Sequence, residues 1–383
     1  MPFPGVSVNV TSGNLLRSVA APDGVGAIVA TAAIADNIGK VQQVFNLQDA
    51  QAKGYTQQGE PFLYGLIEEF YKEIGGSQVL WVMGVAETMT MTDIVDSTMA
   101  DGLGRLLQAA AGDITRVAIA RQPEAGYDAG ARFLDPDVPA AVLGSLPLCQ
   151  AWQERNMPVR ILLEGRVANE DVINDFKPSQ ANNGFAGVVL GGTKAGGSAA
   201  VAVALARACK YPVHVKIGSG QNGALSVGQI YIGDTPIEER LDMETLHDDG
   251  FITFHRRQGT AGYYFGRDNM CTSDDFRILV HGGVIDKAQR VAAEAYTPYI
   301  EDFVRVASDG TINDTDAKHL EDILRASIRS NMGDQISDVD VDIDPAQDII
   351  NTSRLEVQVR VLPLGYLTWI TVTLGLTTQL TAS

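Results

Sequence analysis

Apolar residues in the first quarter of the chain form two runs separated by a helical pattern. Residues 25–33 are apolar or small, and residues 79–85 form a second continuous apolar run. Between Pro61 and Gly75 the apolar residues recur at helical spacing, with proline at the start and glycine at the end. These patterns predict an amphipathic helix between two buried strands that lie parallel.

The same alternation of helical and strand patterns continues to residue 215. The expected elements are a helix through Leu103, Leu106 and Leu107, strands at 117–120, 159–163, 186–190 and 213–215, and an alanine-rich helix at 198–208. Strands that alternate with helices favour an α/β layer built on a mostly parallel sheet.

The pattern changes after residue 218, where a glycine-rich polar segment begins. The elements expected beyond it are a hairpin at 251–255 and 263–265, helices at 285–299 and 315–332, and strands at 336–343, 355–361 and 370–376. We therefore expect an α/β region followed by an α+β domain. The predicted divisions are an N-terminal arm (1–20), two parts of the α/β region (21–95 and 96–240), the α+β domain (241–365) and a C-terminal arm (366–383).

Both ends of the sequence show the alternation of a β-strand. The apolar positions on one face are Val6, Val8 and Val10 at the start, and Ile370, Val372, Leu374 and Leu376 at the end. Such strands either pair inside their own domain or are donated to a neighbouring subunit. An extended arm of ~15 residues reaches about 50 Å, far enough to complete a neighbour's sheet. Donation of this kind is head-to-tail and can propagate into a helical polymer.

Composition narrows the class of protein. The 383 residues are 45% hydrophobic and 20% charged, which is typical of a folded chain with more than one domain. A net charge of -18 disfavours direct binding to nucleic acid or to anionic membranes. No run approaches the ~20 apolar residues of a membrane span, and no basic segment precedes an apolar run near the start. We expect synthesis in the bacterial cytoplasm and no membrane insertion.

Three patterns that suggest chemistry have simpler interpretations. The glycine-rich turn 191–198 stands where a phosphate-binding loop would lie, but Gly197 replaces the required lysine and Lys194 lies inside the loop. The alternating aspartates of 338–344 could suggest calcium, yet alternate strand residues point in parallel, so a solvated acidic face is favoured. The five histidines include no pair at ligand spacing on one helix.

The cysteines add no candidate site. Cys149, Cys209 and Cys271 are odd in number and widely spaced, which fits neither a disulfide framework nor a zinc site. Buried free thiols are expected.

Taken in order, several segments resemble the contractile tail sheath proteins of phages, tailocins and related injection systems. The segments are Pro4–Val8, Gly24–Ala33, Asn46–Gly54, Phe70–Gly76, Leu246–Phe254, Gly262–Met270 and the closing strands. Within Gly262–Met270, Asp268 and Asn269 depart from the family's usual residue after arginine. The resemblance covers roughly 1–90 and 240–383, and the middle is similar in pattern only.

This resemblance implies a structural subunit, with no enzymatic activity and no cofactor, that polymerises around an inner tube and contracts to drive it through a target envelope. The implied partners are other copies of the chain, the inner tube, and baseplate and tail-terminator proteins. The implied location is an assembled virion tail or injection particle. The candidate tube-facing residues on the helix 315–332 are Lys318, Glu321, Arg325 and Arg329.

Two other functions remain open on sequence grounds. The alternating middle region also fits an α/β enzyme or ligand-binding protein, for which a monomer with bound ligand would be expected. A ring-forming tail-terminator or baseplate protein of related fold would form closed rings instead of tubes.

Overall fold

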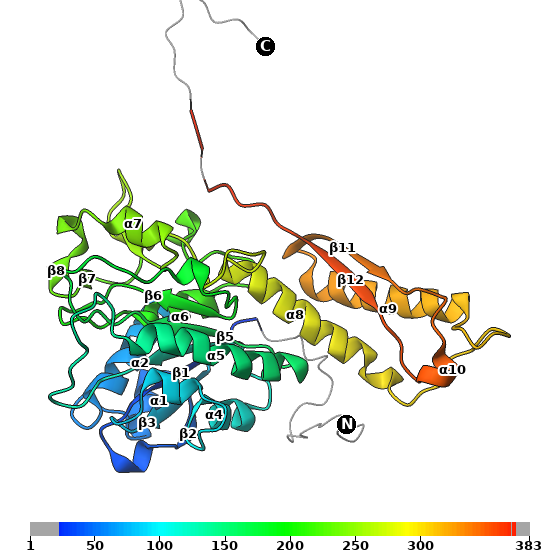
Figure 1. The fold of residues 1–383 in the computed structure, drawn as a ribbon, viewed down its shortest axis with the longest axis horizontal. Helices are drawn as coiled ribbons and strands as arrows, with labels where there is room; N and C mark the ends of the chain where they lie inside the picture. Colours follow the sequence, from blue (N-terminus) through cyan, green and yellow to red (C-terminus); the bar gives the residue numbers. More distant parts are fainter. Residues whose placement is uncertain (1–22, 369, 373–383) are drawn as a thin grey trace, which may run out of the picture.

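The computed structural model describes residues 23–368 and 370–372, which form a large α/β body and a smaller, elongated lobe (Figure 1). The lobe contains the second half of α8 (Leu279–Tyr296), all of α9 (Asp314–Met332), and the strands β11 (Ile336–Asp342) and β12 (Gln358–Pro363). Within the described residues, no helix has both the length and the apolar character needed to cross a membrane.

A six-stranded sheet forms the centre of the body. Its spatial order is β2 (Val41–Val44), β3 (Leu80–Val85), β1 (Gly26–Thr31), β4 (Arg116–Ala120), β5 (Arg160–Glu164) and β6 (Ala186–Val189). All neighbouring strands are parallel except β2 and β3. The chain moves from β1 first to one side of the sheet and then to the other, as in doubly wound folds. The predicted mostly parallel sheet is confirmed.

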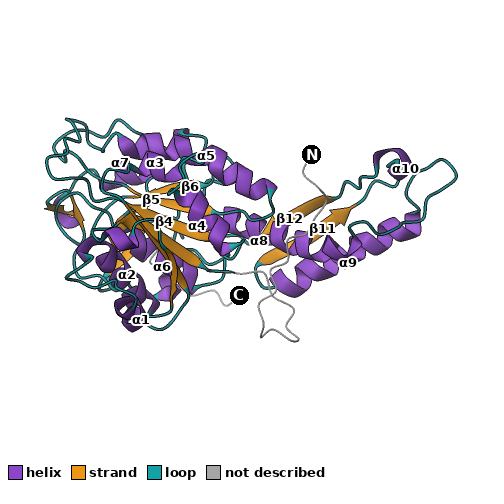
Figure 2. Ribbon diagram, turned by 90° about the horizontal axis from the view of Figure 1, so that it is seen from below, coloured by secondary structure: helices purple, strands orange, loops and turns teal. Residues whose placement is uncertain are grey.

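Helices cover both faces of this sheet (Figure 2). On one face lie α2 (Pro61–Ile74) and α6 (Val201–Lys210), with α1 (Leu47–Ala52) packed on α2. On the other face lie α3 (Met91–Val95), α4 (Leu103–Ala110) and α5 (Asp137–Glu154). The short α7 (Met243–Asp248) lies beyond β6. The arrangement is a three-layer α/β/α body.

Helix α2 shows why the local sequence folds as predicted. Its residues Leu63, Ile67 and Phe70 are fully buried, which places one side of the helix on the sheet. Pro61 occupies the first turn, and Gly75 ends the helix with φ 73°, a left-handed conformation that favours glycine.

Two further hairpins complete the body, β7 (Tyr231–Ile232) with β8 (Thr235–Pro236), and β9 (Phe254–Arg256) with β10 (Tyr263–Phe265). The predicted hairpin at 251–265 is thus present. Ile252 exchanges backbone hydrogen bonds with β6, donating to Val188 at 2.8 Å and accepting from Leu190 at 2.9 Å. The expected division between residues 240 and 241 falls within this packing, and the separate lobe begins only along α8.

The lobe has a core of its own between its helices and strands. Val284 and Val291 of α8 and Leu324 of α9 pack there against Val339 and Val341 of β11. The strands β11 and β12 pair antiparallel, and the short α10 (Ile349–Thr352) lies in the connection between them. The predicted helices at 285–299 and 315–332 and the strands at 336–343 and 355–361 are all present, although α8 begins at Leu279, well before the predicted start.

The first half of α8 is fixed to the body by buried polar contacts. Arg160 of β5 donates from Nε and Nη2 to the two carboxylate oxygens of Asp286, each at 2.6 Å. Arg290 donates to the carbonyl oxygens of Ile114 at 3.1 Å and Pro158 at 2.6 Å. Because the same helix continues into the core of the lobe, α8 joins the two parts rigidly.

One predicted strand is wrong. Residues 213–215 form a turn, in which the N–H of Val215 donates to the carbonyl of Pro212 at 2.9 Å. The apolar side chain of Val213 is buried in the core of the lobe instead of in a sheet. Of the strand expected at 370–376, residues 370–372 belong to no strand within the subunit, and the remaining positions lie outside the described residues, so donation to a neighbour stays a prediction.

Candidate subunit interface

The two-stranded sheet of the lobe is the first candidate contact surface. Val339 of β11 lies opposite Val361 of β12, and Val341 lies opposite Val359. Within the described residues, β11 and β12 pair only with each other, so the outer edge of each presents unpaired backbone groups. Two-stranded sheets are only marginally stable by themselves, and an added strand would extend this sheet on either side.

The side chains of β12 are largely exposed. Val359 is 37% exposed and Leu362 is 59% exposed. Natural sheets usually protect such edges with charges, bulges or a covering segment. An exposed edge with apolar side chains is therefore suited to pairing with another chain.

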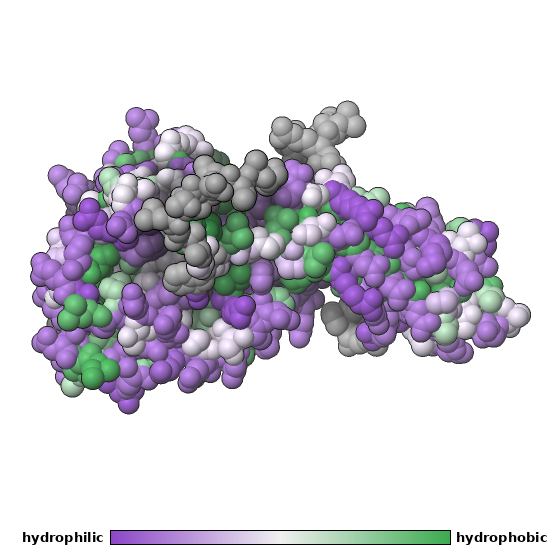
Figure 3. All heavy atoms as spheres, turned by 90° about the horizontal axis from the view of Figure 1, so that it is seen from above, coloured by the Kyte–Doolittle hydropathy of each residue, from purple (hydrophilic) through white to green (hydrophobic). Residues whose placement is uncertain are grey.

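The other strand carries the acidic face that the sequence predicts. Val339 and Val341 are buried, whereas Asp338 and Asp340 point to solvent. Asp338 pairs with Arg329 at 3.0 Å and Asp340 pairs with Arg360 at 3.4 Å, all four being largely exposed. Exposed pairs of this kind contribute little to stability. The face of the lobe seen in Figure 3 is largely hydrophilic.

Both described ends of the chain leave the molecule near the junction of body and lobe. Asp23 is held there by Lys287, at 2.5 Å, and by Gln335, whose Nε2 donates to its carboxylate at 3.2 Å. Gln335 precedes Ile336, which lies opposite Pro363 at the end of β12. The two terminal segments therefore depart from neighbouring points.

The predicted arm residues are only partly within the described structure. Val6, Val8, Val10, Leu374 and Leu376 lie outside the described residues. Ile370 and Val372 are 75% and 70% exposed, so neither packs into the core of its own subunit.

The segment after β12 is anchored to the body by one aromatic residue. The hydroxyl of Tyr366 donates to the carbonyl of His214 at 2.7 Å, and Lys216 Nζ lies 5.0 Å from the centre of its ring. Burial raises the pKa of Tyr366 to about 12, so the hydroxyl stays protonated as a donor. Leu367, the next residue, is 87% exposed. The segment thus lies on the body as far as Tyr366 and then leaves it.

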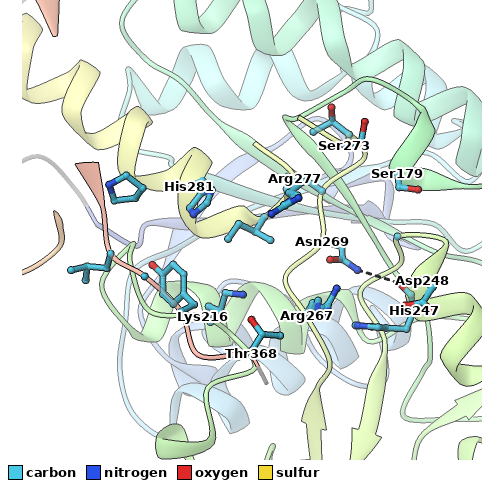
Figure 4. A pocket seen from close by; sticks show the side chains of 18 residues that line it. Ser179, Lys216, His247, Asp248, Arg267, Asn269, Ser273, Arg277, His281 and Thr368 are labelled. Atoms are coloured by element: carbon cyan, nitrogen blue, oxygen red, sulfur yellow. Dashed lines mark hydrogen bonds between the residues drawn. The ribbon is translucent and has the colours of Figure 1, made fainter. Parts of the chain in front are cut away.

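Beside this anchor lies a pocket of about 690 Å³, here named the basic pocket, between the body and the segment 363–368 (Figure 4). Its lining residues with charged or imidazole side chains are Lys216, His247, Asp248, Arg267, Arg277 and His281. Lys216 faces the buried carboxylate of Asp268 at 3.5 Å. The wall is fixed by Asn269, whose Nδ2 donates to the carbonyl of His247 at 3.3 Å.

The candidate tube-facing residues of α9 do not share one environment. Lys318 and Arg329 have side chains 70% and 58% exposed. Glu321 is buried, and its carboxylate accepts from Lys318 at 2.9 Å and from the backbone N–H of Ile343 at 3.1 Å. Arg325 is partly buried and donates to the carbonyl of Val341 at 2.9 Å. Glu321 and Arg325 thus tie α9 to the end of β11, and the exposed cations are Lys318 and Arg329.

The carboxyl edge of the large sheet is where an α/β enzyme would bind its ligand. Here that edge is occupied by buried side chains that pair with one another and with the backbone. Arg121, after β4, pairs with Asp137 at 3.1 Å, and both side chains are buried. The carboxylate of Asp137 also accepts the backbone N–H of Thr92 at 3.0 Å. Glu164, at the end of β5, accepts the backbone N–H groups of Arg121 at 2.9 Å and Ala199 at 3.2 Å.

The glycine-rich loop after β6 is also closed on itself. A side chain at Gly197 would place its Cβ 2.4 Å from the carbonyl oxygen of Val167, and one at Gly192 would lie 2.2 Å from that of Ser198. The hydroxyl group of Thr193 donates a hydrogen bond to the carboxylate of Glu69. These close approaches explain the glycines without a phosphate, as the ordinary turn interpretation expects.

Glu164 gives a testable pH dependence. Burial raises its pKa to about 7, so the folded state holds the proton more tightly than the unfolded state does. Its contribution to the free energy of unfolding therefore falls as pH rises from ~4.5 to about 7. When the pH is raised from 5 to 8, we expect the free energy of unfolding of Glu164→Gln to rise by roughly 2 kcal/mol relative to that of the parent. Urea unfolding at the two pH values measures this change.

The exposed Glu154 provides the control, because Glu154→Gln should show no such change between the two pH values. If the free energies of unfolding of the parent and of Glu164→Gln differ by the same amount at pH 5 and at pH 8, the raised pKa of Glu164 is contradicted.

Two family models together match almost the whole chain. DUF2586, N-terminal domain, matches residues 3–269, and DUF2586, C-terminal domain, matches residues 275–381. The boundary between them lies just before α8, the helix that runs from the body into the lobe. A search of curated proteins gives no match.

Solved structures share the fold over nearly the full length. A chain in the anti-feeding prophage (AFP) baseplate structure gives a TM-score of 0.62 at 12% identity, covering 99% of this chain and 100% of that chain. The AFP helical sheath in the contracted state gives 0.62 at 14% identity, with 98% and 99% covered. A sheath tail protein from Desulfitobacterium hafniense gives 0.53 at 11% identity, with 94% and 100% covered. The chain belongs to the DUF2586 family and has the fold of contractile tail sheath proteins.

Proposed function

We propose that this chain is the structural subunit of a contractile tail sheath, which polymerises helically around an inner tube and contracts to drive that tube forward. The observation that carries the proposal is the open-edged sheet of β11 and β12, which lies beside the points where both terminal segments leave a sheath-like fold. The same chain would then contain a sheet edge that can accept a strand and two terminal segments that can each donate one.

The terminal segments supply the links between subunits. The residues before Asp23 span at most about 75 Å when extended, enough to reach an adjacent copy. A strand added to the outer edge of β12 or of β11 would form main-chain hydrogen bonds, and on the β12 side it would lie beside the exposed Val359 and Leu362. Because donor and acceptor differ, the contact is head-to-tail and builds an open helix instead of a closed dimer.

The rigid connection through α8 bears on contraction. The buried Arg160–Asp286 pair joins body and helix, and the same helix forms the core of the lobe. A contraction step then moves whole subunits past one another while the terminal strands keep them linked. The free energy comes from better packing in the contracted lattice, with the extended lattice held behind a kinetic barrier.

The same proposal assigns the remaining partners. Lys318 and Arg329, the exposed cations of α9, are candidates for contact with the inner tube. Baseplate and tail-terminator proteins would bind the two ends of the polymer, and the particle would assemble in the bacterial cytoplasm. A chain of this fold in a baseplate structure supports a second candidate, a ring-forming baseplate protein.

Val372→Pro tests the donated C-terminal strand. Proline removes a backbone donor and is tolerated only at strand edges or bulges, so it should weaken pairing with a neighbour. Val372 is 70% exposed, so the fold of the subunit itself should not change. We expect unchanged circular dichroism and a shift in sedimentation from long tubes to monomers or short oligomers.

Val372→Thr is the matched control, since threonine keeps both the backbone donor and a β-branched side chain. It should assemble as the parent does. Normal tubes from Val372→Pro would count against strand donation at this position.

A further inference from the structure

The basic pocket contains two arginines that pair with no carboxylate among the described residues. Arg267 follows β10 and Arg277 precedes α8, and both line the pocket. Within the described part of the chain, neither guanidinium group has a hydrogen-bond or ion-pair partner. Among the described lining residues, Asp248 alone carries a carboxylate, and Lys216 is already paired with Asp268.

This arrangement is unexpected in a chain with 47 acidic and 29 basic residues. Most arginines of the described structure, such as Arg121, Arg160 and Arg207, face a carboxylate. Arg267 and Arg277 instead border an open pocket, as the close view shows (Figure 4). An excess of positive charge at one place on an acidic molecule favours an anionic partner.

The chemistry of the pocket suits a carboxylate. A guanidinium group is planar and offers paired donors that match the two oxygens of a carboxylate. A volume of about 690 Å³ accommodates several side chains together, which is more than a single small anion needs. The polar groups of Asn269 and Ser273 lie in the same lining and add neutral hydrogen-bonding capacity.

We propose that the basic pocket receives an acidic segment of a second copy of this chain, with Arg267 and Arg277 binding its carboxylates. This inference rests on the proposed function, because it places the contact between neighbouring subunits of the polymer. Local charge complementarity supports this occupant, since a chain with 47 acidic and 29 basic residues presents acidic segments, such as the exposed face of β11, to the arginines of a neighbour.

The position of the pocket supports the same occupant. One wall is the segment 363–368, which Tyr366 anchors just before the chain leaves the body. A neighbour that receives the C-terminal segment is therefore brought close to the pocket. A suitable acidic surface exists on β11, where Asp338, Asp340 and Asp342 stand at alternate positions ~6.8 Å apart and point to solvent. The exposed pairs of Asp338 with Arg329 and of Asp340 with Arg360 are weak, so these carboxylates can exchange partners.

The test is assembly of the full-length chain with both arginines replaced. We expect Arg267→Ala/Arg277→Ala to raise the concentration needed for polymerisation by about tenfold or more, because two charge-assisted contacts are lost. Polymerisation of this double variant should also depend less on salt concentration than polymerisation of the parent does. Sedimentation across a series of NaCl concentrations measures both effects.

A matched control removes two exposed arginines elsewhere. Arg132 and Arg354 have side chains 68% and 76% exposed, and their variant Arg132→Ala/Arg354→Ala should polymerise as the parent does. Thermal unfolding of both double variants should match the parent, which separates loss of contact from loss of fold.

The outcomes distinguish this inference from the proposed function. If the parent polymerises and Arg267→Ala/Arg277→Ala does so at the same concentration and with the same salt dependence, the pocket serves another partner and the inference is overturned. If the parent forms no polymer at all, the proposed function is wrong, and the inference that rests on it is wrong as well.

Discussion

Removal of residues 368–383 is expected to leave a folded, soluble subunit that no longer assembles into long tubes. The described residues of this segment are exposed, with Ile370 at 75% and Val372 at 70%, so their loss removes little from the core. Tyr366 stays in place and keeps its hydrogen bond to His214. If the segment adds a strand to a neighbour, its deletion removes that link from every subunit contact along the polymer. Sedimentation and electron microscopy measure the loss.

Deletion of residues 1–18 should have the same effect, because each arm supplies a separate link. The fold is checked by circular dichroism and thermal unfolding, which should stay near those of the parent. If either truncated protein unfolds, its terminal strand belongs to the subunit's own core. If it still builds normal tubes, the arms do not hold the polymer together.

Asp286→Ala is expected to cost about 3–5 kcal/mol in the free energy of unfolding, the range found when one partner of a buried ion pair is removed. Arg160 is 2% exposed, so its guanidinium would keep a buried charge without its carboxylate partner. Urea unfolding of the purified subunit measures the change.

Asp322→Ala is the control for this prediction. Asp322 pairs with Arg325 at 2.8 Å, but its side chain is 73% exposed, so its removal should cost less than about 1 kcal/mol. Similar small effects from both substitutions would show that the Arg160–Asp286 pair does not hold α8 to the body.

The sequence predicts those elements whose burial is uniform or periodic. Strands β1 and β3 are continuous apolar runs, and α2 carries apolar residues at helical spacing, so local pattern and final environment agree. Strand β2 was not predicted, because its two central residues are Gln42 and Gln43 and it pairs only at the edge of the sheet.

Errors arose where a distant segment decides the local structure. Helix α8 begins at Leu279, earlier than the predicted 285, and the added turn contains Gly282 and Gly283. Glycine normally disfavours a helix, but a Cβ at Gly282 would lie 2.6 Å from Cζ of Arg160. The close approach of β5 requires glycine there, and no local pattern reveals that contact. Val213 is a similar case, because the core cluster that buries it includes Val284, which lies far along the chain.

The candidate interface was predictable only in part. Alternation at 336–343 and 355–361 indicated the strands of the lobe, and the acidic face of β11 followed from that alternation. The basic pocket could not be predicted, because Lys216, Arg267, Arg277 and Tyr366 come together only through the packing of four separate segments. Helical spacing likewise could not show that Glu321 is buried under the end of β11.

A cryo-electron microscopy reconstruction of the full-length protein, assembled at high concentration, tests the central claim most directly. The account predicts a helical tube in which a strand from a neighbouring copy hydrogen-bonds to the outer edge of β12 or β11. Monomers, closed rings, or tubes in which that sheet stays two-stranded would contradict it.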